Sequence, residues 1–89
     1  MANRLIKLPE RYEASPIDDE LMLIDIDSGR FFALKDVALR IWTSLDGESD
    51  LDSIASVLSA EYEVAPQHAR QSVGNFADSL VDAGFARFT

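Results

Sequence analysis

The stretch "DIDSGRFFALKD", residues 25–36, holds the side chains that come closest to a metal site in this sequence. Asp25, Asp27 and Asp36 occupy the first, third and twelfth places of a calcium-loop pattern, in which carboxylate oxygens bind the ion. The pattern fails because the glycine stands at the fifth place rather than the sixth and phenylalanines fill ligand positions. We therefore interpret residues 25–29 as a hairpin turn and Asp36 as the N-cap of a following helix, and we predict no metal site.

The rest of the sequence offers little that could carry out catalysis. The acidic run Asp18–Glu20 is typical of a solvated corner, and His68, the one histidine, has no second histidine or cysteine with which to bind a transition metal. There is no cysteine, no serine in a nucleophile-elbow pattern and no glycine loop that could bind phosphate. We predict that the protein is not an enzyme and uses no cofactor.

Length and composition predict one small folded domain. The chain has 89 residues, of which 47% are hydrophobic, and a chain of this size forms a single core. Residues 1–12 mix basic and apolar types without periodicity, so we expect a flexible arm there and a domain over residues 13–89. The sequence contains no signal peptide or membrane-spanning run, and we expect a cytoplasmic protein.

The net charge argues against nucleic acid as a partner. Sixteen acidic residues against eight basic ones give −8, and the basic residues are scattered along the chain. A phosphate backbone would be repelled unless the basic side chains gathered on one face.

Apolar spacing predicts two or three strands followed by three helices. We expect a short strand ending near Ser15, a central strand at residues 21–26 and an antiparallel return at residues 30–34 after Gly29. Helical spacing follows at residues 37–45, with Trp42 in the core, then at 51–62, and from Pro66 to the stop at Gly84.

The return strand "RFFAL", residues 30–34, raises a question about its far side, because the chain leaves it directly for a helix. Phe31 and Phe32 should point to opposite faces, and a single charge stands at the start of the strand. An open apolar edge of this kind can bind an extended peptide by strand addition. The alternative is that the N-terminal arm covers this edge, and the spacing does not separate the two.

The order of these features resembles the PqqD-like family, the peptide-recognition proteins of pathways that modify ribosomally made peptides. The resemblance spans about residues 18–86 and rests on the apolar strand, the turn at Gly29, the aromatic pair with Leu34, Ile41-Trp42, "LDG" at residues 45–47 and the final "AGF". The sequence lacks the tyrosine-proline-glutamate-glycine turn of the pyrroloquinoline quinone pathway member. It is more similar to stand-alone relatives that serve lasso peptide maturation.

The resemblance implies an α+β fold, a winged helix-turn-helix with a three-stranded antiparallel sheet followed by three helices. It also implies that the leader of a precursor peptide adds a strand beside residues 30–34 and lies against the third helix, and that Arg30 pairs an acidic leader residue. The implied peptide-binding residues are Arg30, Phe31, Phe32, Ala33 and Leu34 on the strand and Arg70, Gly74, Ala77, Asp78 and Val81 on the helix, where small Gly74 and Ala77 allow close approach.

Three functions stay open at this point. The first is a peptide chaperone that presents the leader to a maturation enzyme, such as a leader protease, a cyclase or a radical SAM enzyme. The second is a winged-helix DNA-binding regulator, although residues 66–83 hold Arg70 as their one lysine or arginine. The third, a structural subunit that caps a larger enzyme, is not separable from the first by sequence.

Overall fold

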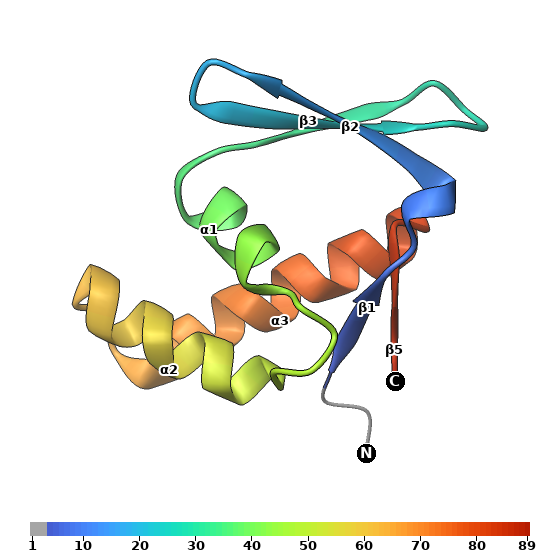
Figure 1. Ribbon diagram of the computed structural model, residues 1–89. Coiled ribbons are helices and arrows are strands. Elements are labelled where there is room, and N and C mark those ends of the chain that lie inside the picture. Colours follow the sequence, from blue (N-terminus) through green and yellow to red (C-terminus); the bar gives the residue numbers. More distant parts are fainter. Residues whose placement is uncertain (1–3) are drawn as a thin grey trace.

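The computed structural model describes residues 4–89 and contains a three-stranded sheet, a two-stranded sheet and three α-helices (Figure 1). The sheets lie at two sides of the helices, the larger one above α1 and α3 in the view of Figure 1. In chain order the elements are β1 (Leu5–Lys7), the 3₁₀ helix η1 (Pro9–Arg11), β2 (Tyr12–Ile17), β3 (Glu20–Asp25), β4 (Phe31–Leu34), α1 (Asp36–Ser44), α2 (Leu51–Tyr62), α3 (Pro66–Ala83) and β5 (Ala86–Phe88).

The larger sheet has the order β2-β3-β4, with both pairs antiparallel and β3 in the centre. Three helices follow it in the chain, so the predicted α+β fold with a three-stranded antiparallel sheet and three helices is confirmed. Within the described residues, no helix has the length and apolar character needed to cross a membrane.

The N-terminal residues differ from the flexible arm that we expected over residues 1–12. Residues 1–3 lie outside the described residues, and Leu5–Lys7 form β1, which pairs antiparallel with β5. Leu5 is fully buried in the core, and this burial holds the segment against the domain. A strand of three residues with one polar member has no visible periodicity, which is why the sequence did not reveal it.

The turn between β3 and β4 accounts for the calcium-like spacing. The Asp25 carboxylate accepts a hydrogen bond from the Asp27 backbone N–H (3.0 Å) and another from the Ser28 hydroxyl (2.9 Å). The Gly29 N–H donates to the Asp25 carbonyl (2.9 Å), and Gly29 takes a positive φ of 76°. The acidic side chain therefore closes a hairpin turn, as predicted from its sequence.

Helix α1 is not capped by Asp36, and that prediction is wrong. The N-cap position is Lys35 in an extended conformation, with no side-chain cap hydrogen bond. Asp36 is the first helical residue and has a φ of 53°, a left-handed value that aspartate tolerates better than most residues. The tight change of direction after β4 sets the conformation of Asp36, and the preference of aspartate for the N-cap position does not override it.

An aromatic cluster joins the sheet to the helices at the centre of the core. Phe85 is 0% exposed and makes edge-on contacts with Tyr12 from β2 and Phe32 from β4. The ring centroids are 5.6 Å apart in the first pair and 5.3 Å apart in the second. Tyr12 also meets Trp42 of α1 edge-on at 5.3 Å. Trp42 is buried, as predicted, and these contacts fix the position of β4 relative to the end of α3.

Carboxylates bonded to the backbone make the stability of this fold depend on pH. At the N-cap of α2, the Ser53 backbone N–H donates to Asp50 at 2.7 Å and lowers the pKa of that carboxyl. The Asp27 backbone N–H similarly lowers the pKa of Asp25. A carboxyl whose folded-state pKa lies below its unfolded-state pKa stabilises the fold above the unfolded value, and this contribution disappears as pH falls through the folded value.

We therefore expect the free energy of unfolding to fall as pH is lowered from 7 through about 4 toward 2. Urea denaturation at a series of pH values measures this. The variant Asp50→Asn keeps a capping oxygen but does not titrate, so its stability should change less with pH than that of the wild type. An identical pH profile for the two proteins would remove Asp50 from this account.

Candidate functional site

Strand β4 is an open edge of the larger sheet. It pairs with β3 on one side, and the sheet order places no described strand on its other side. The alternative that the N-terminal arm covers this edge does not hold for the described part of the arm, because β1 pairs with β5 in the other sheet. The opposite edge, β2, contains Pro16, which has no N–H to donate.

The backbone N–H and C=O groups of two residues in β4 point toward the open side of the sheet. The Asp25 N–H donates to the Arg30 carbonyl at 2.8 Å, so the polar groups of Arg30 face β3. Backbone groups alternate in direction along an antiparallel strand. Phe32 and Leu34 therefore also bond toward β3, whereas the N–H and C=O groups of Phe31 and Ala33 face outward and are available to another strand.

The two phenylalanines lie on opposite faces of the sheet, as their adjacency predicts. Phe32 pairs in register with buried Leu23, packs edge-on against Phe85 and is 37% exposed. Phe31 pairs with Ile24 on the outer face and is 65% exposed. One ring therefore borders the core and the other lies on a surface that no described element covers.

A hollow of about 240 Å³ lies between β4 and the C-terminal half of α3. Its apolar part is formed by Phe32 and Ala83, and its polar part by Arg30, Ser79 and Asp82. The open strand edge and this hollow are adjacent because both include Arg30 and Phe32. A chain bonded to β4 would therefore place its inward side chains in the hollow.

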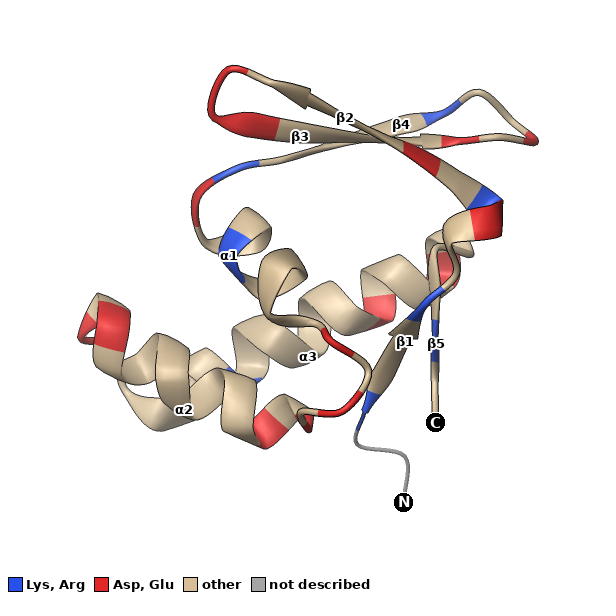
Figure 2. Cartoon of the chain, viewed as in Figure 1, with Lys and Arg blue, Asp and Glu red and all other residues tan. Residues whose placement is uncertain are grey.

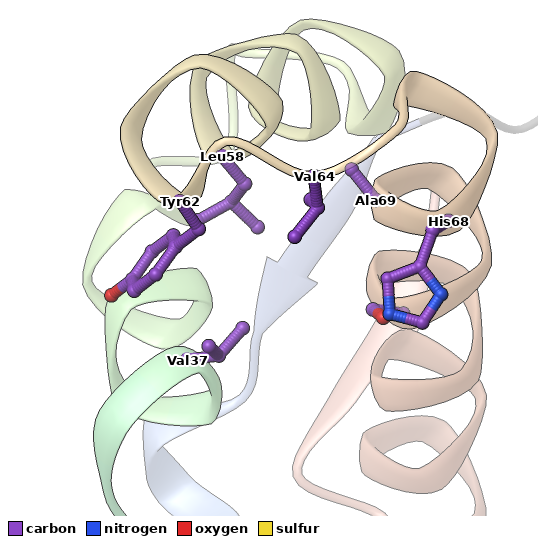
Figure 3. A pocket seen from close by; sticks show the side chains of 7 residues that line it. Val37, Leu58, Tyr62, Val64, His68 and Ala69 are labelled. Atoms are coloured by element: carbon purple, nitrogen blue, oxygen red, sulfur yellow. The ribbon is translucent and has the colours of Figure 1, made fainter.

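A second, more apolar cavity of about 80 Å³ lies where α1, α2 and α3 meet (Figure 3). Val37, just after β4, and Tyr62 and Val64 contribute apolar side chains, while His68 and Ser72 come from α3. Ser72 and Ser79 are two helical turns apart on nearly the same side of α3. The cavity and the hollow therefore lie along one side of this helix.

The predicted strand residues lie at the open edge, whereas the predicted α3 residues do not line the hollow, and their contact with a peptide stays a prediction. Arg30–Leu34 form the open edge, although Leu34 itself is buried in the core. On α3, Ser79 and Ala83 differ by about 40° around the helix axis, whereas Gly74 and Val81 lie about 140–160° from Ser79. The hollow is thus not lined by the predicted residues Arg70, Gly74, Ala77, Asp78 and Val81.

The physical reason for this difference is the choice of flank beside the apolar stripe of α3. Ala77 belongs to the buried stripe itself, together with Ala69, Val73 and Leu80. Either flank of such a stripe can face the sheet, and helical spacing alone does not say which. The flank that lines the hollow is set by the contact of Phe85 with Phe32, which ties the end of α3 to β4 and leaves no signal in the helical spacing.

Gly74 gives a direct test of the flank. A methyl group at this position would meet no heavy atom within 4 Å, and alanine is favoured over glycine inside a helix. We expect Gly74→Ala to raise the free energy of unfolding by about 0.5–1 kcal/mol in urea denaturation and to leave peptide affinity within about twofold. A large loss of affinity would place a bound peptide on the flank predicted from the sequence.

Charge is distributed unevenly around the site (Figure 2). On α3 the acidic residues Asp78 and Asp82 lie in the C-terminal half, and Arg70 is its one lysine or arginine. Residues 4–89 contain no cluster of acidic, histidine or cysteine side chains that could hold a metal ion. The acidic side chains on this half of α3 are unfavourable for phosphate binding.

The sequence profile of the family described as Coenzyme PQQ synthesis protein D (PqqD) matches residues 20–86, which include the whole of β3, β4 and the three helices. The chain belongs to the PqqD family. The resemblance that the sequence motifs suggested is confirmed. No curated protein matches this PqqD-family chain.

Two solved structures share the fold of this PqqD-family protein over nearly its whole length. Lasso peptide synthetase B1 complexed with the leader peptide is 26% identical, has a TM-score of 0.83, and covers 94% of this chain and 98% of its own. TbiB1 in complex with the TbiA(beta) leader peptide is also 26% identical, with a TM-score of 0.79 and coverage of 92% and 95%. Both neighbours were solved with a leader peptide bound.

Proposed function

We propose that this PqqD-family protein binds the leader segment of a ribosomally made precursor peptide by adding it as a strand to β4. The observation that carries this function is the open edge of β4, whose outward backbone groups at Phe31 and Ala33 lie beside a hollow that can take side chains. The leader-bound state of its two structural neighbours supports the same function. The protein itself would recognise the peptide without catalysing a reaction.

The bound leader would continue the antiparallel sheet. Its backbone would exchange hydrogen bonds with Phe31 and Ala33, and its side chains would alternate between the hollow and the outer face. Ser79, Asp82 and Ala83 of α3, which line the hollow, would form the opposite wall. Main-chain hydrogen bonds provide general affinity for an extended chain. Selectivity comes from the side chains that enter the groove, the space between β4 and α3 that contains the hollow.

The groove favours a leader with two apolar anchors. An antiparallel chain would pass first by the cavity near Val37 and Ser72 and then by the hollow near Phe32 and Ala83. Along α3, Ser72 of the cavity is about 10–16 Å from Ser79, Asp82 and Ala83 of the hollow at 1.5 Å per helical residue. An extended chain covers this distance in about three to five residues. We expect apolar side chains at that separation in the leader.

The outer face of the sheet is a candidate surface for the maturation enzyme that receives the leader. Phe31, Ala33, Ile24 and Met22 lie on this face by register, and Phe31 is 65% exposed. A leader strand bonded to β4 would extend the same face with its own outward side chains. An enzyme that docks here would therefore contact the recognition protein and its cargo together.

A binding experiment tests the proposed function. The probe is the fluorescein-labelled leader segment of a candidate precursor peptide, chosen from short reading frames next to the gene for this protein and titrated in fluorescence anisotropy. We expect saturable binding with a Kd between about 1 nM and 1 μM, as is reasonable for an extended peptide that orders on docking. The core segment of the same precursor, which follows the leader, serves as the control and should not bind. Equal affinity for the two segments would contradict leader recognition.

A further inference from the structure

We propose that the hollow between β4 and α3, which both Arg30 and Asp82 line, selects an uncharged leader side chain that both accepts and donates hydrogen bonds. Asparagine and glutamine fit this description best, and serine and threonine are the smaller members of the class. The inference rests on the proposed function and adds a specificity element to it. It also replaces the expectation that Arg30 pairs an acidic leader residue.

The two charges stand on different walls of the same hollow. Arg30 precedes β4 and Asp82 lies in the last turn of α3, and both line the 240 Å³ space together with Ser79. The ion pair found within the described residues is Arg40–Glu61, so Arg30 and Asp82 are more than 4.0 Å apart by their charged atoms. The hollow thus presents a cation and an anion that do not satisfy each other.

Strand alternation identifies the leader residue that would enter this space. Arg30, Phe32 and Leu34 share one face of the sheet, because they alternate with the outward residues Phe31 and Ala33. The leader residue opposite Phe32 would pack on Phe32 and Ala83, the apolar part of the hollow. The residue two positions later would stand opposite Arg30, between the guanidinium and the Asp82 carboxylate.

The chemistry of the two walls favours an amide at that place. Its carbonyl oxygen can accept from Arg30 while its NH₂ group donates to Asp82. A glutamate would gain Arg30 but face the Asp82 carboxylate, and a lysine would gain Asp82 but face the guanidinium. An apolar side chain would remove water from both charged side chains and would not replace the hydrogen bonds that this water made with them.

The position of Asp82 is a second reason to assign it a role. Helix α3 ends at Ala83, so Asp82 places a negative charge at the helix end that already carries the negative end of the dipole. The same helix has no basic residue in its last turn. A carboxylate is therefore unfavourable here for the helix alone, whereas it has a use as one wall of the groove.

The test is a specificity switch measured by fluorescence anisotropy. Each position of the strand-pairing segment in the leader peptide is replaced in turn by Gln, Glu, Lys and Leu, and each peptide is titrated against wild type, Asp82→Asn and Arg30→Gln. For one position the wild type should bind the Gln peptide about tenfold more tightly than the Leu peptide. At that position Asp82→Asn should prefer Glu and Arg30→Gln should prefer Lys, each by about fivefold.

Matched variants control for net charge. Asp19→Asn in the β2–β3 turn and Arg87→Gln in β5 make the same charge changes at exposed places outside the groove, and they should keep the wild-type order of peptides. If the wild type binds the leader but no position responds to both Arg30 and Asp82, the selection proposed here is wrong and leader binding stands. If the wild type binds no leader peptide, the proposed function itself fails.

Discussion

Replacing Ala33 with proline should weaken binding of the leader peptide at least tenfold while leaving the protein folded. The Ala33 N–H faces the open side of β4, so proline removes a hydrogen bond to the leader, and its ring occupies the place of the leader carbonyl. The fold should tolerate the change, because an edge strand accepts proline where its N–H points to solvent. Anisotropy titration measures the affinity, and circular dichroism confirms the fold.

The matched control for this variant is Ala33→Thr. Threonine keeps the N–H and suits a strand, and its side chain lies on the exposed outer face, so affinity should stay within about threefold of wild type. A folded Ala33→Pro protein with full affinity would show that the leader does not bond to this edge. Equal losses in both variants would point to the outer side chain rather than to the backbone.

Replacing Phe85 with alanine should lower the free energy of unfolding by about 3–5 kcal/mol, the usual effect of removing a fully buried aromatic ring. Phe85 is 0% exposed and makes edge-on contacts with Tyr12 and Phe32. Because these contacts hold β4 at the end of α3, leader affinity should fall as well, even where the protein is still folded. Urea denaturation measures the first effect.

Phe31→Ala makes the same chemical change on the exposed outer face. Phe31 is 65% exposed, so its loss should lower the free energy of unfolding by less than about 1 kcal/mol. Both variants remove a phenylalanine ring, so the difference between their free energies of unfolding reports the effect of burial. If Phe85→Ala were no less stable than Phe31→Ala, the aromatic cluster would not be what joins the sheet to the helices.

The sequence predicted well those elements whose side chains repeat at a clear period or end at a marked residue. Helix α3 begins at Pro66 and ends before Gly84, as its punctuation indicated, and Gly84 has a φ of 83°. The hairpin around Gly29 also followed from local chemistry, because a turn acceptor and a positive φ are encoded by residue type. Because adjacent residues of a strand point to opposite faces, Phe31 and Phe32 were expected to lie in different environments.

Features that depend on distant contacts were not predictable in the same way. Strand β1 exists because Leu5 is buried and Leu5–Lys7 meet β5 at the other end of the chain. The flank of α3 that lines the hollow depends on how the helix is rotated against the sheet, which the Phe85–Phe32 contact fixes. Neither relation leaves a periodic signal in the sequence. The open edge of β4 could therefore be predicted from the sequence, whereas the α3 residues that line the hollow beside it could not.

The central claim, that the leader adds as a strand to β4, is tested most directly by hydrogen exchange of backbone amides measured by NMR. On saturation with the leader peptide, the Phe31 and Ala33 amides should exchange much more slowly, whereas those of Phe32 and Leu34, already bonded toward β3, should change little. This alternation belongs to strand addition. Uniform protection along β4, or protection at the β2 edge instead, would contradict it.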